Sequence, residues 1–144
     1  MRARRTTATS RAPKALTASI SSQSKVYDGT NAASLVAGTV SAAGSYSLSG
    51  FISGQGAYIN QTNATYNSAN VANATTVTAA LSLSNFVATG STNLSNYALP
   101  TSVSASGSIT PATLTMSANA SAKFIGQTDP TFTYSLSGLK GADT

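Results

Sequence analysis

The chain has 144 residues, of which 41% are hydrophobic and only 8% are charged, far below the roughly 25% of an ordinary soluble domain. This length suits one domain and part of a second, and the apolar content excludes a chain that is disordered through low hydrophobicity and high charge. No apolar run approaches the roughly 18 residues of a membrane helix, and no apolar region follows the basic N-terminus as in a secretory signal.

The net charge of +5 belongs to the N-terminus. From Ala15 onward three lysines balance three aspartates, so the surplus lies before that residue. No aromatic residue is interleaved with these basic residues, so we expect a disordered, solvated tail over residues 1–12 and no binding to nucleic acid. The basic residues before Ala15 are Arg2, Arg4, Arg5, Arg11 and Lys14.

In chain order, apolar residues alternate with serine and threonine at a period of two, which predicts half-buried strands. A helix is tempting only over residues 72–80, but the β-branched run Thr75-Thr76-Val77-Thr78 favours a strand. The alternating apolar positions are Leu16, Ala18 and Ile20; Tyr46, Leu48 and Gly50; Val77, Ala79, Leu81 and Leu83; and Phe132, Tyr134 and Leu136.

Turn residues separate these runs at Asp28-Gly29, Ala43-Gly44, 53–56 and 89–91. Short strands with turns at this spacing predict an all-β fold. We expect an Ig-like β-sandwich, with a β-grasp-like arrangement as the alternative.

Residues 13–30 are echoed by residues 111–128 at a constant offset of 98 residues, from Pro13 to Pro111 and from Lys25 to Lys123. A repeat of this length suggests tandem domain-sized modules. We therefore expect a tail at 1–12, a complete β module at 13–110 and a partial second module at 111–144. The partial module should be poorly packed, because it lacks strands to cover Phe132 and Leu136.

The residue inventory argues against enzymatic chemistry and against a bound cofactor. The chain has no histidine, no cysteine and no glutamate, which removes the usual catalytic triads and zinc sites. Ser24 and Lys25 remain as a candidate dyad, but neighbours on a strand point to opposite faces. The three aspartates, Asp28, Asp129 and Asp143, are too far apart in sequence to suggest a calcium site.

The segment Lys25-Val26-Tyr27-Asp28-Gly29-Thr30 resembles the signature of the YDG repeat domain of bacterial filamentous haemagglutinin-like surface adhesins. The similarity continues at residues 64–72, 96–100 and 109–112. Residues 124–139 are similar to the start of an MBG domain, with Ile125 where that pattern usually has tyrosine.

The resemblance implies a secreted or cell-surface protein of the bacterial outer membrane, in which the modules form a non-enzymatic stalk. Its partners would be neighbouring modules of the same chain, while other domains would contact a host glycan or protein. Direct binding of a host glycan or receptor by this module is the alternative, and exposed rings at Tyr46, Tyr58 or Tyr66 would support it. The alternation instead suggests that many of these rings point inward.

Within the signature we expect structural roles. Asp28 should form the turn by accepting local N–H groups, and Tyr27 should pack in the core or against a neighbouring module. Lys25 should extend over that neighbourhood into water, with at most a weak ion pair to Asp28. Five Asn-X-Ser/Thr triplets match the glycosylation pattern, but a chain so rich in these residues produces them by chance. They begin at Asn60, Asn63, Asn73, Asn93 and Asn119.

Overall fold

The computed structural model describes residues 11–143, and the expected all-β class is confirmed. The described residues contain two single-turn 3-10 helices, η1 (Leu83–Asn85) and η2 (Leu94–Asn96), but no α-helix and no helix that could cross a membrane. Most of the expected tail at 1–12 lies outside the described residues. The strands are β1 (Lys14–Ala15), β2 (Thr17–Ile20), β3 (Gln23–Val26), β4 (Ala32–Ser34), β5 (Tyr46–Ser49), β6 (Gln55–Ile59), β7 (Asn63–Tyr66), β8 (Thr76–Ala80), β9 (Phe86–Gly90), β10 (Tyr97–Ala98), β11 (Ser102–Thr110), β12 (Thr115–Ala118) and β13 (Tyr134–Ser137).

The largest sheet has five strands in the order β3-β11-β8-β7-β4. Its pairs are antiparallel except for β3 and β11, which run in parallel with Thr110 opposite Val26. Two further antiparallel pairs, β2-β5 and β6-β9, and the short parallel pair β1-β10 complete the domain.

A single hydrophobic core joins the five-stranded sheet to the pairs β2-β5 and β6-β9. Ile59 of β6 and Val77 of β8 are fully buried, and Ile20 of β2 belongs to the same cluster. Residues from both layers thus meet in one interior, as in sheets packed face to face. The alternation predicted Leu83 as the next inward residue after Leu81, but this expectation is wrong: Leu83 is 68% exposed, because the strand ends at residue 80 and η1 begins.

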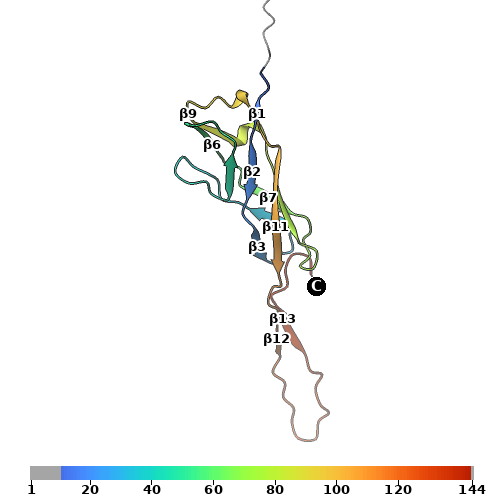
Figure 1. Cartoon of the computed structure of the whole chain (residues 1–144). Helices are drawn as coiled ribbons and strands as arrows, with labels where there is room; N and C mark the ends of the chain where they lie inside the picture. Colours follow the sequence, from blue (N-terminus) through green and yellow to red (C-terminus); the bar gives the residue numbers. More distant parts are fainter. Residues whose placement is uncertain (1–10, 144) are drawn as a thin grey trace, which may run out of the picture.

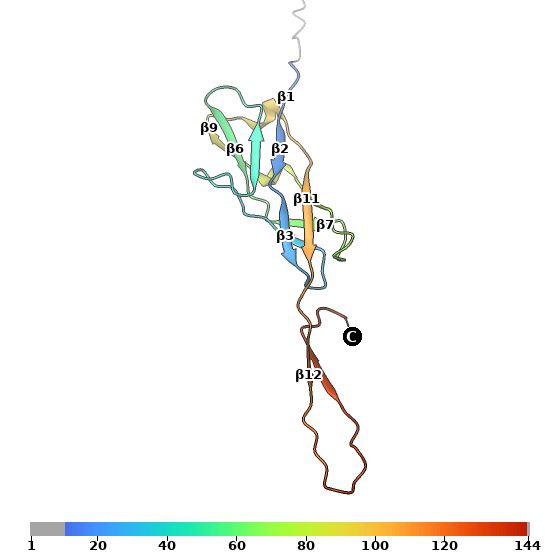
Figure 2. The same ribbon diagram turned by 60° about the horizontal axis from the view of Figure 1, so that its bottom comes forward.

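The domain is elongated, and the chain enters and leaves it at opposite ends (Figures 1 and 2). We call the end at β1 and β10 the N-terminal pole. The opposite end, where β3 and β11 finish side by side, is the exit pole. β1, β2 and β3 follow one another from pole to pole, and β11 runs in the same direction as β3.

Beyond the exit pole, β12 and β13 form a projecting hairpin whose pairing repeats that of β2 and β5 (Figures 1 and 2). The pair β2-β5 is not itself a hairpin, because β3 and β4 lie between its two strands in the chain. Tyr-Ser-Leu-Ser forms both β5 and β13, at an offset of 88 residues from Tyr46 to Tyr134. The pairing register is also repeated. Ile20 faces Tyr46 in the pair β2-β5, and Ala118 faces Tyr134 in the pair β12-β13. The structure therefore extends the 98-residue echo into a second strand.

The pairs β2-β5 and β12-β13 differ in whether other residues cover them. Tyr46 is 4% exposed, whereas its counterpart Tyr134 is 63% exposed, and every residue of β12 and β13 is exposed. Phe132 and Leu136, which we expected to lack cover, are 78% and 43% exposed.

Candidate functional site

The signature segment begins at the end of β3, and its lysine is drawn inward. Lys25 Nζ lies 2.8 Å from Asp28 Oδ1, 2.8 Å from the Ala32 carbonyl oxygen and 2.9 Å from the Thr30 carbonyl oxygen. The side chain is only 18% exposed, and Nζ lies 5.6 Å from the centroid of the Tyr66 ring, within cation–π range. This corrects the expectation that Lys25 extends into water, because protein oxygens replace its solvent shell.

Asp28 forms the turn in the way expected from its sequence. Its Oδ1 accepts hydrogen bonds from the Thr30 N–H and the Thr30 hydroxyl, both at 2.9 Å. The hydrogen bond from Lys25 and those from Thr30 lower the pKa of the Asp28 carboxyl from 3.8 to about 2. Gly29 follows with φ +82°, a left-handed conformation that favours glycine. We call residues 25–30 the YDG turn.

Tyr27 joins the YDG turn to both the core and the chain beyond the domain. Its N–H donates to the Thr110 carbonyl at 2.8 Å, and its half-buried ring packs against the core cluster. Its hydroxyl donates to Asp143 Oδ1 at 3.2 Å. This hydrogen bond, burial and the negative charges of Asp143 and Asp28 raise the pKa of the Tyr27 hydroxyl. The ring therefore packs on the core as expected, and its hydroxyl contacts the segment that follows the domain.

The candidate dyad and a metal cluster are both missing from the YDG turn as the structure describes it. The ammonium of Lys25 is held by the turn oxygens, while its sequence neighbour Ser24 is exposed, so the two do not form a dyad. Across residues 11–143 no group of three or more Asp, Glu, His or Cys side chains could hold a metal ion. In the same range no buried residue is polar or charged.

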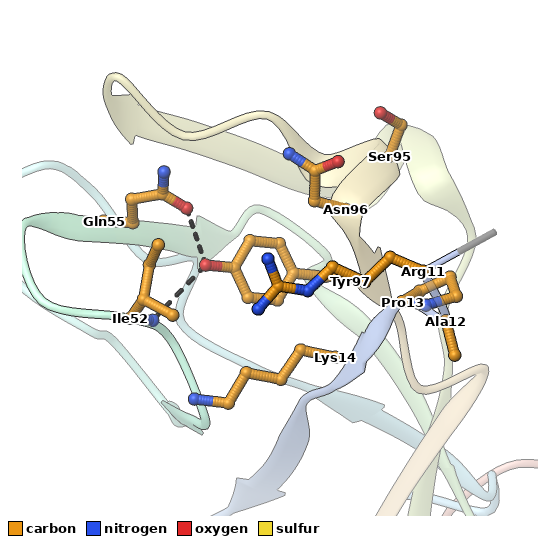
Figure 3. A pocket seen from close by; sticks show the side chains of 9 residues that line it. All are labelled: Arg11, Ala12, Pro13, Lys14, Ile52, Gln55, Ser95, Asn96 and Tyr97. Atoms are coloured by element: carbon orange, nitrogen blue, oxygen red, sulfur yellow. Dashed lines mark hydrogen bonds between the residues drawn. The ribbon is translucent and has the colours of Figure 1, made fainter. Parts of the chain in front are cut away.

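A hollow of about 310 Å³ lies at the N-terminal pole, and no sequence pattern pointed to it (Figure 3). Tyr97 lies at its centre, 6% exposed, and donates to Gln55 Oε1 at 2.6 Å while accepting from the Ile52 N–H at 3.3 Å. The volume of this hollow is at the lower end of the range for ligand pockets. The lining residues are Arg11, Ala12, Pro13, Lys14, Ile52, Gln55, Ser95, Asn96 and Tyr97.

The tyrosines considered as a sugar-stacking platform do not form one. Tyr46 and Tyr66 are 4% and 3% exposed, and only Tyr58 is partly accessible. The Tyr46 hydroxyl donates to the Gln61 carbonyl at 2.8 Å, so this ring is fixed inward. The inward orientation predicted from the alternation is confirmed for Tyr46 and Tyr66.

A comparison with protein-family models matches residues 12–106 to the YDG domain. This match covers well over half of the chain. The chain belongs to the YDG domain family. Within this YDG domain, the signature residues lie at the exit pole and hold the end of β3 against the end of β11. Neither the search of curated proteins nor the search of solved structures found a match.

Proposed function

We propose that this YDG domain is a non-enzymatic spacer in the stalk of a large bacterial adhesin that is secreted or displayed at the cell surface. One observation carries the proposal: the chain enters the domain at one pole and leaves it at the other (Figure 1). A domain connected in this way adds its full length to an array. A domain with adjacent ends would add little.

The length added by one domain follows from its strands. β1, β2 and β3 run from residue 14 to residue 26, where Val26 lies opposite Thr110. A strand rises about 3.3 Å per residue, so the domain spans about 40 Å between its poles. The parallel pairing of β3 with β11 ties the N-terminal run of strands to the last strand of the domain, so that tension across the domain would act on the hydrogen bonds between β3 and β11.

The composition also suits a stalk outside the cell. The core is built from apolar side chains without a buried charge in residues 11–143, and the exposed face of the strands is rich in serine and threonine. Such a domain needs no metal or disulfide to complete its interior. Its partners would be the neighbouring modules of the same parent chain. The residues after Pro111, which resemble an MBG domain, would begin the next of these modules.

A second candidate function is direct binding of a host glycan or receptor. The hollow at the N-terminal pole favours it, since Lys14 and Asn96 place polar groups beside the apolar side chain of Ile52. A glycan array probed with the chain tests this candidate. Binding that is lost in Lys14→Ala or Asn96→Ala would support a receptor site, and the absence of any binding would leave the spacer as the function.

The spacer is tested with proteins that carry one, two and four copies of residues 12–110 in series. Small-angle X-ray scattering should show a maximum dimension that grows by about 40 Å with each added copy. A dimension that grows much more slowly would mean that the copies fold back on one another, and would refute the spacer.

A further inference from the structure

The YDG turn is in contact with a second turn, formed by residues 140–143 beyond the projecting hairpin. A Cβ atom placed on Gly29 would lie 2.9 Å from the Cα atom of Gly141, so the two backbones touch. The Tyr27 hydroxyl also donates a hydrogen bond of 3.2 Å to Asp143 across this contact. Gly141 has φ +58°, so both contacting residues adopt conformations that favour glycine.

The turn at 140–143 has a counterpart inside the YDG domain. Asp143 N–H donates to the Lys140 carbonyl at 3.1 Å, and Gln55 N–H donates to the Ile52 carbonyl at the same distance. The two pairs are separated by the offset of 88 residues that relates β5 to β13. Each turn follows the second strand of its pair, β5 or β13. The backbone of the turn that touches Gly29 therefore belongs to the repeated structure.

The turn also begins from a repeated glycine. Gly50 and Gly138 directly follow β5 and β13, with φ +103° and φ +101°. A Cβ on either residue would clash with a backbone carbonyl oxygen, that of Ala15 in β1 for Gly50 and that of Thr113, just before β12, for Gly138. These two oxygens are themselves related by the offset of 98 residues, so β5 and β13 lead into the following turn in the same way.

We propose that the YDG turn is a docking site for the first turn after the opening hairpin of the next module, and that this contact fixes the angle between consecutive modules. This inference rests on the proposed spacer function. The occupant is a tight turn whose glycine allows close backbone approach and whose aspartate accepts a hydrogen bond from Tyr27. Signature residues that lie beside no reactive group then have a mechanical role at the joint.

The position of the YDG turn explains why this contact sets an angle. The covalent link between the modules passes through Thr110 and Pro111, at the end of β11. A single covalent link allows the two modules to rotate relative to each other. A second contact to one side of it, at Gly29 and Tyr27, restricts rotation about that link, and the internal bonds of Lys25 keep this contact in a fixed place.

The joint is tested by nuclear magnetic resonance on the full chain. The wild-type protein should show a cross-peak between the Hα protons of Gly29 and Gly141. Residual dipolar couplings from residues 13–110 and from the β12-β13 hairpin should fit one alignment tensor. If residues 13–110 and the hairpin need different alignment tensors and the cross-peak is missing, the proposed joint is refuted.

Two matched pairs of variants decide whether the contact is the cause. In Gly141→Ala the new Cβ would lie 3.2 Å from the Gly29 Cα, whereas at Gly126, with φ +88°, nothing lies within 4 Å. Gly141→Ala should therefore abolish the cross-peak and separate the tensors, and Gly126→Ala should do neither. If Gly141→Ala keeps the single tensor, or if both variants lose it, the joint is refuted.

Tyr27→Phe and Tyr58→Phe form the second pair and leave the hairpin untouched. The Tyr58 hydroxyl makes no hydrogen bond within the part of the chain that the structure describes. Only Tyr27→Phe should weaken the cross-peak, and equal spectra for the two variants would refute the role of the hydroxyl. Failure of the joint can be told apart from failure of the spacer. If arrays lengthen by a constant step but consecutive modules do not share one alignment tensor, the domain is a spacer whose modules rotate freely, and only the joint is refuted.

Discussion

The internal bonds of the YDG turn predict a measurable loss of stability in Lys25→Met. This change keeps the unbranched stem and removes the ammonium, which donates to the carbonyl oxygens of Thr30 and Ala32. A hydrogen bond that involves a charged group contributes about 1.5–3 kcal/mol, and water can reach both exposed carbonyls in the variant. We therefore expect a loss of about 1–2 kcal/mol, while the exposed ion pair to Asp28 adds little.

Urea unfolding measures this loss. With an m-value of about 2 kcal/mol per M for a small domain, the midpoint should fall by about 0.5–1 M. Lys14→Met is the matched control, because Lys14 is an exposed lysine on the short strand β1 and should leave the midpoint unchanged.

The same variant should change the titration of Asp28. The lowered pKa of Asp28 stabilises the fold above about pH 3.8, and this contribution is lost as the pH falls toward 2. Without Lys25 the pKa should rise from about 2, yet stay below 3.8, because Thr30 still donates twice. A midpoint equal to that of Lys14→Met, together with an Asp28 pKa that stays near 2, would refute this account of the turn.

Three further predictions follow from the packing and the turns. Ile59→Ala, at a fully buried position, should cost about 2–5 kcal/mol in urea unfolding, and a loss below 1 kcal/mol would contradict the assigned core. Gly50→Ala should lower the melting temperature more than Gly54→Ala. Both glycines have positive φ, but only a Cβ at Gly50 would meet a backbone oxygen, at 2.7 Å. Equal shifts of the melting temperature would contradict this prediction. The raised pKa of Tyr27 stabilises the fold below about pH 10, and this stabilisation is lost as the pH rises through the pKa of the folded state. Asp143→Asn should lower the pKa of Tyr27 in a titration followed by ¹³C resonances, because it removes the charge that the hydroxyl faces. An unchanged pKa would rule out the contact.

The strands were predictable wherever one face of the sheet is buried. Ile20, Tyr46 and Val77 all point inward as the period of two requires. Leu83 broke the pattern because Ser82 caps a 3-10 turn with Asn85, a local preference that competes with the continuation of a strand. The alternation of apolar residues alone does not show at which residue a local turn ends the strand.

The repeat was only half visible in the sequence. The echo from Lys25 to Lys123 was found because it has a single offset, but Tyr134 matches Tyr46 at a different one. The chain between the paired strands is shorter for β12-β13 than for β2-β5, so a comparison at one offset loses the register. The shared pairing of Ala118 with Tyr134 and of Ile20 with Tyr46 restores it.

The site was predictable as a motif but not as a set of contacts. The turn role of Asp28 is local and follows from its residue type. The oxygens that hold the Lys25 ammonium are local, but the residue types alone do not show that the turn closes around it. The Tyr66 ring beside the ammonium comes from a distant part of the chain. The hollow around Tyr97 likewise gathers residues from three separate segments, so only the tertiary fold brings them together.

The separation of the two poles is the central claim, and one distance in the full chain tests it most directly. The chain has no cysteine, so spin labels on Ala12→Cys and Thr113→Cys would be the only two in the molecule. Pulsed electron resonance should give a single narrow distance of about 55 Å, the extended length of residues 12–26 (about 46 Å) plus that of the three residues from Thr110 to Thr113 (about 10 Å). A distance below about 20 Å would place the two ends side by side, and the domain could not then act as a spacer.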